Sequence, residues 1–497
     1  MTSRVLFVPL DERPCNLRFP HMQFAPDGPI ELVTPPDSLL GKKKHPADVD
    51  GIYSWLERTL PDVTACVLSI DTLLYGGLLP SRLHHESANT LHMRVRRLMD
   101  LVRRERSQRD LPVFVFASIM RTPSYSSDDE EPPYYEDYGE QLFRLGVLQH
   151  KRNRRMLGSE EHGALTELEH TVPPEVIRDW TERRRVNLEN TRLVIRAVAD
   201  GLFDYLVLPQ DDTSPLGYSA MDWEQVDSAL TDQTVRDRVL SYPGSDELGC
   251  VLTARAALTV RHKPAPNVSL VWRDEAAAAV VPPFESVPLG ESIREQIRAA
   301  GARVFGNGAH SGDSIDIVLF VNTPNPDHPV ESSNQVDRDH SRAIERLGAI
   351  VENPDRPRVI AVADVAYPNG AEAGFVRAVT ERGLWPHLDA FAAWNTSGNT
   401  LGTVIARAVV ESAWPDRSTR ERNVFYRVAD DWAYQTVLRR RDAGRGFDVE
   451  PDTKQWAEDI DRLAVRVLPD ARWRVQDVVF PWNRPFEVGL VLESRTR

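Results

Sequence analysis

Two adjacent aspartates, Asp211 and Asp212, lie two residues beyond the end of residues 205–208, an apolar segment typical of a buried strand. At a strand tip, two neighbouring carboxylates in a cleft of low dielectric cannot both ionise cheaply, so the pKa of one rises and that group can act as an acid. The same pair could instead hold a hard divalent cation, or cap the helix expected around Trp223. We predict that Asp211 and Asp212 are catalytic, with Asp212 as the general acid or base.

A third candidate catalytic acid, Asp71, lies among apolar residues. A buried acid needs a partner, and Arg13, Arg82 or Arg121 could supply a guanidinium group. The glycines that follow at positions 76 and 77 would allow the backbone to approach a ligand closely. A purely structural role for Asp71 is the alternative.

Polar side chains also follow five other apolar segments. In a parallel sheet the carboxyl ends of the strands lie at one edge, so we expect these side chains to line one polar cleft. An indole ring stacks on the C–H faces of sugars, and amides and carboxylates bind hydroxyl groups. The predicted substrate-binding residues are Asp11, Arg13, Asn16, Tyr75, Arg82, Arg121, Asp246, Asp364, Asn369, Trp394, Asn395 and Asn399.

The elements that would position these residues alternate between strand and helix, which indicates a parallel α/β fold. The strands are expected at residues 5–8, 30–33, 65–70, 113–117, 205–208, 268–272, 315–321, 359–363 and 390–393. The helices are expected at residues 91–106, 187–199, 291–300 and 341–351.

Two architectures fit this alternation. If residues 30–33 form an accessory strand, the other eight strands can close a TIM-like (β/α)₈ barrel, which we favour. The alternative is two doubly wound parallel-sheet domains with a break near residues 264–283. We expect an α/β catalytic domain at residues 1–410 and a mostly helical region at 411–497. The acidic, aromatic insertion at 121–140 is either a lid or wall of the site or a solvated loop.

The composition excludes several classes of protein. A net charge of −14 argues against a general affinity for nucleic acid or an anionic membrane. No apolar run approaches the roughly 18 residues of a membrane span. Three scattered cysteines cannot form a disulfide framework, so we expect a soluble protein of the reducing cytoplasm. Neither a dinucleotide-binding fingerprint nor a zinc-binding His pattern is present, and we expect no cofactor.

Six phrases of the sequence resemble an uncharacterised bacterial family, the domain of unknown function 4127. They are VPLDERPCN (8–16), SIDTLLYGGLLPSR (69–82), LPQDDTSPLG (208–217), YPGSDE (242–247), ADVAYPNGAE (363–372) and AWNTSGNTLG (393–402). The name of this family implies no activity.

A weaker likeness is to the substrate-assisted β-N-acetylhexosaminidases, in which two acids follow the fourth strand of a barrel. By this likeness, one of Asp211 and Asp212 would orient the substrate acetamide, whose oxygen attacks the anomeric carbon. The other acid would protonate the leaving oxygen. The likeness depends on one dipeptide and on strand order.

The leading hypothesis is a glycoside hydrolase for a small or oligomeric saccharide, with Asp71 and Asp11 as hydroxyl ligands or a second acid. A second hypothesis is a hydrolase or transferase that holds Mg²⁺, Mn²⁺ or Zn²⁺ between Asp11, Asp71, Asp211 and Asp212. The third is a non-catalytic protein that binds a sugar or another metabolite. The sequence leaves the oligomeric state open.

Overall fold

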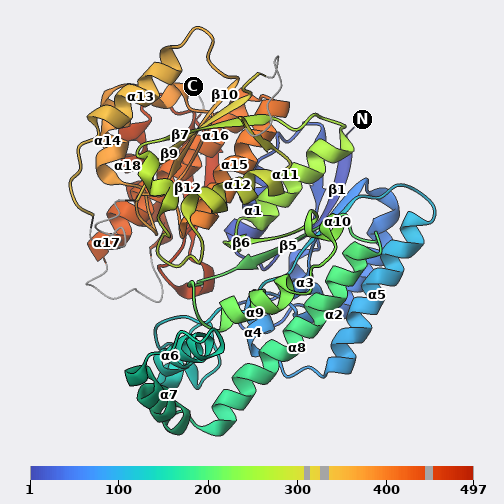
Figure 1. The fold of residues 1–497 in the computed structure, drawn as a ribbon. Coiled ribbons are helices and arrows are strands. Elements are labelled where there is room, and N and C mark those ends of the chain that lie inside the picture. The colour runs from blue at the N-terminus through green and yellow to red at the C-terminus, as the bar shows by residue number, and fades with distance from the viewer. Residues whose placement is uncertain (1, 307–313, 325–334, 443–451, 496–497) are drawn as a thin grey trace.

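The computed structural model describes residues 2–306, 314–324, 335–442 and 452–495, which form two open, parallel β-sheets surrounded by helices (Figure 1). The first sheet has the order β2-β1-β3-β4-β5-β6, and every neighbouring pair is parallel. Its strands are β1 (Ser3–Val8), β2 (Ile30–Val33), β3 (Ala65–Ser69), β4 (Val113–Phe116), β5 (Tyr205–Gln210) and β6 (Val239–Pro243).

The second sheet has the order β11-β10-β9-β7-β8 and is also parallel throughout. Its strands are β7 (Asn267–Trp272), β8 (Arg303–Val304), β9 (Ile317–Asn322), β10 (Val359–Asp364) and β11 (Ala390–Ala392). All nine predicted strands are present, and the four predicted helices are α5 (Ala88–Arg106), α8 (Pro174–Ala199), α12 (Leu289–Ala299) and α13 (Ser341–Glu352).

The preferred prediction of a closed barrel is wrong. The first sheet ends at β6, and β7 pairs with β8 and β9 in the second sheet instead of continuing from β6. Residues 30–33 form a regular edge strand beside β1. The chain passes from one sheet to the other through α11 (Leu248–Val260), close to the break that the alternative architecture placed at 264–283.

Alternate residues of the first sheet face two different cores. Leu6 and Val8 of β1 pack with α5, α8 and α2 (Val49–Thr59), whereas Val5 and Phe7 face the opposite side. On that side lie α1 (Pro14–Met22) and α11, and the core continues without interruption through α12 to the second sheet (Figure 1). One hydrophobic core therefore joins the two sheets.

The helix α15 (Ser397–Ala413) lies in this shared core and is buried on all sides over most of its length. It packs against α11, α12 and β10. The approach is close at Gly402, where a Cβ atom would lie 2.1 Å from Cγ of Glu247 and 2.7 Å from Oε1 of Gln296. The seam between the sheets therefore requires glycine at this position.

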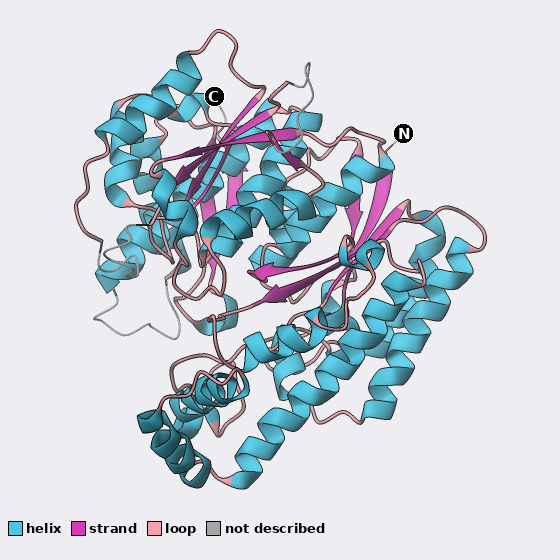
Figure 2. Cartoon of the chain, viewed as in Figure 1, coloured by secondary structure: helices cyan, strands magenta, loops and turns pink. Residues whose placement is uncertain are grey.

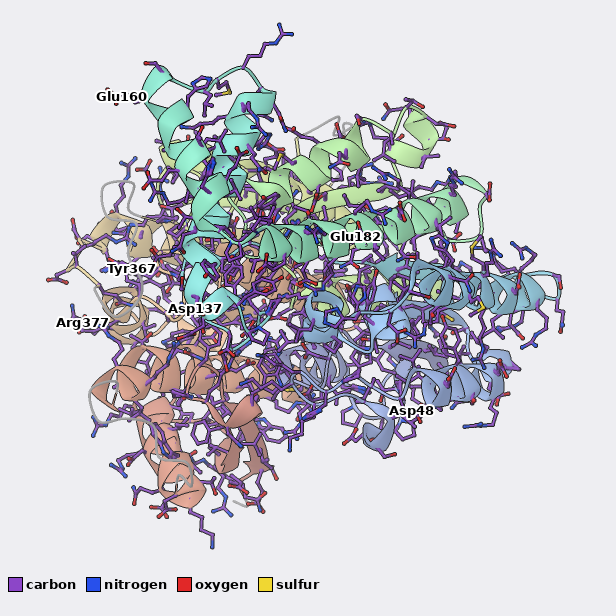
Figure 3. The ribbon with its side chains drawn as sticks, turned by 90° about the horizontal axis from the view of Figure 1, so that it is seen from below. Asp48, Asp137, Glu160, Glu182, Tyr367 and Arg377 are labelled. Atoms are coloured by element: carbon purple, nitrogen blue, oxygen red, sulfur yellow. The ribbon has the colours of Figure 1, made fainter. Side chains whose placement is uncertain are left out.

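The insertion after β4 begins as a loop and continues into α6 (Tyr135–Asn153) and α7 (Ser159–Thr171). These two helices project from the body of the molecule (Figure 2). Glu160 of α7 lies at the outer edge in the view from below (Figure 3). The loop portion, in contrast, turns back towards the strand tips of the first sheet.

The C-terminal region combines helices with a hairpin. α16 (Arg417–Arg427), a π-helical segment (Val428–Leu438), α17 (Arg439–Asp442) and α18 (Thr453–Val467) precede the antiparallel strands β12 (Trp473–Val479) and β13 (Gly489–Ser494). We call the connection between these strands, residues 480–488, the C-terminal strap. Across the described parts of the chain, no helix is long and apolar enough to cross a membrane.

We expect Gly402→Ala to lower the free energy of unfolding by about 1–3 kcal/mol, because the added methyl group must displace Glu247 or Gln296 in a close-packed seam. The control is Gly163→Ala in α7, where an added Cβ meets no atom within 4 Å and should stabilise the helix by up to about 1 kcal/mol. Urea denaturation of both variants measures the difference. A Gly402→Ala protein as stable as the control would show that the seam is loosely packed.

Candidate functional site

The carboxyl ends of the two sheets meet at Asp246, which follows β6. Its backbone N–H donates to Oδ1 of Asn399 over 3.0 Å, and Nδ2 of Asn395 is 3.4 Å from its Oδ2. Both asparagines follow β11 of the second sheet. The predicted convergence of strand ends therefore extends from one sheet to the other.

Arg13 and its partners form what we call the first network. Arg13 follows β1, and its Nη2 lies 2.7 Å from Oδ2 of Asp11 and 2.6 Å from Oδ1 of Asp246. Nδ2 of Asn16 donates to the same two carboxylates over 3.0 and 2.9 Å. All four side chains are buried. Burial opposes the charge on Arg13, but Asp11 and Asp246 raise its pKa well above the ordinary value, so it stays ionised.

Arg82, Arg121 and their partners form the second network, at the tips of β3, β4 and β5. Nη2 of Arg82 lies 2.5 Å from Asp211, and Nη1 of Arg121 lies 2.6 Å from Asp212. Glu130 contacts both guanidinium groups, at 3.2 and 2.9 Å, and Glu131 also contacts both. The loop portion of the insertion at 121–140 is therefore part of this site, as one of its two predicted roles required.

The carboxyl group of Asp212 differs from its neighbours in the second network. Its side chain is 19% exposed, and its backbone has φ 35°, in the left-handed region that few residues other than glycine adopt. Burial and the charge of Asp211 raise its pKa to about 6, against the opposing effect of Arg121. Asp212 can therefore exchange a proton near neutral pH.

The C-terminal strap connects the two networks. Nη1 of Arg484 lies 2.5 Å from Glu130, and its Nη2 lies 3.3 Å from Glu487, which also contacts Arg13 at 3.4 Å. The ring of Trp482 contacts the guanidinium groups of both Arg13 and Arg484, each of which lies 4.6 Å from the ring centroid. A chain of ion pairs therefore runs from Asp11 to Asp212.

The joined networks hold more acids than bases. The four guanidinium groups belong to Arg13, Arg82, Arg121 and Arg484. The eight carboxyl groups belong to Asp11, Asp129, Glu130, Glu131, Asp211, Asp212, Asp246 and Glu487. Even with Lys43, which pairs with Asp129, five positive charges face eight carboxyl groups. Burial raises the pKa values of Asp212 and Glu487, whereas at Glu130 the guanidinium groups of Arg121, Arg484 and Arg82 outweigh burial and lower the pKa.

Two of the predicted residues lie in a separate cluster at the tip of the second sheet or beside it. Asp364 is buried and accepts hydrogen bonds from Asn322 and from the backbone of Glu372, and burial with the charge of Glu372 raises its pKa to about 7. The N–H of Asn369 donates to the carbonyl oxygen of Asn395 over 2.8 Å. Asn369 therefore supports the loop that reaches the first network.

Four predicted residues face the protein interior. Trp394 is 7% exposed and its Nε1 donates to Thr403, so little of its ring surface is available for the predicted stacking on a sugar. Tyr75 stacks on a histidine ring within the protein, and Asn399 caps backbone N–H groups. Asp71 is 2% exposed and accepts from the N–H of Ser118. Its role here is to position the loop after β4.

The large cavities lie elsewhere. One of about 900 Å³ is lined by Trp385, Phe425 and Arg466, and another of about 660 Å³ by Trp414 and Arg422. Neither is lined by a described residue of the two networks.

The structure gives no support to a metal ion between Asp11, Asp71, Asp211 and Asp212. The carboxylates of Asp11, Asp211 and Asp212 each pair with a guanidinium group. The carboxylate of Asp71 accepts a hydrogen bond from a backbone N–H group. Over the described ranges, no group of three or more His, Cys, Asp or Glu side chains is arranged to hold a metal ion.

Sequence reasoning missed Glu130, Glu131, Trp482, Arg484 and Glu487. The two glutamates lie in the insertion, whose acidic composition was the available signal. Arg484 lies 354 residues from Glu130 in the chain, and nothing in the local pattern of the strap indicates that contact.

The comparisons with known proteins identify a family but no activity. The family model described as "Protein of unknown function (DUF4127)" matches residues 5–491, nearly the whole chain. No curated protein and no solved structure matches the chain. The likeness to the β-N-acetylhexosaminidases therefore gains no support.

We expect Arg13→Met to destabilise the fold by about 3–5 kcal/mol, because it leaves the buried carboxylates of Asp11 and Asp246 facing each other without a cation. The matched control is Arg97→Met, which removes exposed ion pairs with Asp50 and Glu57 and should change stability by less than about 1 kcal/mol. Urea denaturation compares the two variants. Equal, small effects would show that Arg13 does not hold the network together.

Proposed function

The chain belongs to the DUF4127 family. From the geometry of its site, we propose that it is a glycoside hydrolase. It would cleave a small or oligomeric saccharide by acid–base catalysis between carboxyl groups, with Asp212 as the general acid and base. The observation that carries the proposal is the state of Asp212: a partly exposed carboxyl group at a strand tip, with its pKa raised to about 6 beside Asp211.

Glycoside hydrolysis needs two carboxyl groups with different roles. Asp211 pairs with Arg82 at 2.5 Å and Asp212 with Arg121 at 2.6 Å, and only Asp212 has its backbone in the left-handed region. Asp211 would stabilise positive charge at the anomeric carbon. Asp212 would donate its proton to the glycosidic oxygen as the bond from that oxygen to the anomeric carbon breaks. A water molecule would then add to the anomeric carbon. A proton from that water would pass to the carboxylate of Asp212 and return it to its protonated form.

An N-acetylhexosaminide would allow a substrate-assisted version of this reaction. The acetamide oxygen of the substrate, polarised by Asp211, would attack the anomeric carbon as the bond to the glycosidic oxygen breaks and Asp212 protonates that oxygen. Water would then open the resulting ring at the anomeric carbon, with Asp212 accepting the proton. This version needs no nucleophile from the protein.

Binding of the sugar would use the first network. Asn16, Asn395 and the carboxylates of Asp11 and Asp246 offer the donors and acceptors that sugar hydroxyls require. Trp482, which is partly exposed, would provide the aromatic face in place of Trp394. Because the strap carries Trp482, its movement would both admit the saccharide and position this ring.

We expect Asp212→Asn to lower the rate of hydrolysis at least about 100-fold, because the amide cannot supply the proton. Release of nitrophenol from a panel of 4-nitrophenyl glycosides, including the N-acetylglucosaminide, measures the rate. The control is Asp227→Asn, which alters an exposed ion pair with Arg236. In the wild type, catalysis that requires protonated Asp212 should fall as the pH rises above about 6.

Activity in Asp212→Asn equal to that of the control would remove Asp212 from the mechanism. If no substrate of the panel is turned over while calorimetry detects sugar binding, the protein is a binding protein and not a hydrolase.

A further inference from the structure

A second group of buried polar side chains lies behind Asp246, in the seam between the sheets. Glu247 precedes α11, Glu285 lies in the loop before α12, and Gln296 lies within α12. The exposed fractions of these three side chains are 0%, 2% and 0%. All three are close to Gly398 or Gly402 of α15. We call them the seam cluster.

Each member of the seam cluster has one polar atom fixed and one without a partner. Oε2 of Glu247 accepts from the N–H of Ser245 over 2.7 Å, and Oε1 of Glu285 accepts from the N–H of Gly398 over 2.5 Å. Nε2 of Gln296 donates to the carbonyl oxygen of Gly398 over 3.0 Å. The remaining oxygens, Oε1 of Glu247, Oε2 of Glu285 and Oε1 of Gln296, are buried without a hydrogen bond. Buried acceptors rarely remain unsatisfied, so three together require an explanation.

These three side chains lie against the same turn of α15, between Gly398 and Gly402. The position of a Cβ atom on Gly402 lies 2.1 Å from Cγ of Glu247 and 2.7 Å from Oε1 of Gln296. Glu285 and Gln296 bond to the N–H and the carbonyl oxygen of the same residue, Gly398. The charge of Glu285 also acts on Glu247.

The two glutamates have no cationic partner. Across the described residues, neither Glu247 nor Glu285 forms an ion pair with an Arg, Lys or His side chain. This contrasts with the networks, in which every carboxylate contacts a guanidinium group. Burial raises the pKa of both carboxyl groups to about 8. Buried carboxylates that lack a cationic partner are stable only if a proton or a bound cation compensates their charge.

We infer that Glu247, Glu285 and Gln296 bind one hard divalent cation, such as Mg²⁺, Mn²⁺ or Ca²⁺. The free atoms of the seam cluster are all oxygens, two from carboxylates and one from an amide, which is the donor type that these ions prefer. The hydroxyl groups of Ser245 and Ser292 are also buried and unbonded. Ser292 lies one turn before Gln296 on the same face of α12, so it is available as a further ligand.

The bound ion would connect the two sheets. Glu247 follows β6 of the first sheet, whereas Gly398, which fixes the other two ligands, follows β11 of the second. The ion would therefore stabilise the seam on which Asp246 depends. This role is independent of the proposed hydrolase activity, and its test does not use turnover.

The first experiment uses the full chain without mutation. After purification in the presence of MgCl₂, MnCl₂ or CaCl₂ and gel filtration, elemental analysis should find about one ion per chain for the preferred metal. Treatment with EDTA should lower Tm by several degrees, and the preferred metal should restore it, because ligand binding to the folded state stabilises it. No retained ion and no change in Tm would overturn the inference.

The second experiment locates the ion. Glu285→Gln and the double variant Glu247→Gln/Glu285→Gln should lose the ion and the response of Tm to EDTA. The control is Glu411→Gln in α15, where the buried carboxylate of Glu411 pairs with Arg407; this variant should retain the ion. If the double variant is as stable as the wild type, and none of the three metals changes the Tm of the wild type, the two glutamates are protonated and the inference fails. It also fails if the double variant still binds the ion.

Discussion

The guanidinium group of Arg13 is the interaction on which the rest of the site depends. It follows the first strand, yet it bonds to the carboxylate of Asp246, which follows the sixth. That carboxylate accepts from Asn395, and the backbone N–H of Asp246 donates to Asn399; both asparagines follow the last strand of the other sheet. Open sheets have no ring of hydrogen bonds to hold their ends in place. Here a single buried cation, with two carboxylates around it, fixes the ends of three strands from two sheets.

The excess of acids over bases gives the networks their chemical character. A buried ion pair contributes little net stability, because desolvation of the charges offsets much of their attraction. Its value here is geometric, since each guanidinium group holds two or more carboxylates at fixed positions. Burial raises the pKa values of Asp212 and Glu487, and Asp212 is the one of these two that follows a strand of the sheet.

Much of the fold could be predicted from the sequence. Buried parallel strands are short, apolar and bounded by polar residues, so all nine expected strands are present. Strand β6 was missed because Ser241 and Pro243 interrupt its apolar pattern. The choice between a barrel and two sheets depends on which strands pair, and alternation of strand and helix is the same in both. The closed barrel was therefore preferred wrongly.

The site was predicted only in part, for a similar reason. Polar residues at strand tips follow from the topology of a parallel sheet, and Asp11, Arg13, Asn16, Asp246, Asp211 and Asp212 do converge. Burial of an individual side chain depends on neighbours far along the chain, so the interior position of Trp394 had no local signal. The contribution of the strap could not be predicted, because its contacts with the first 131 residues are purely tertiary.

The strap also determines when the site can form during synthesis. A ribosome makes the chain from its N-terminus, and domains generally begin to fold as they emerge. Both parallel sheets, with all their strand tips, are complete before Arg484 and Glu487 are translated. Arg484 follows Glu130 in the chain by 354 residues. Until then, Glu130 lacks one of its cations and the two networks are separate. A nascent or truncated chain can thus form both sheets without a complete site. The site is complete only when the strap has been synthesised.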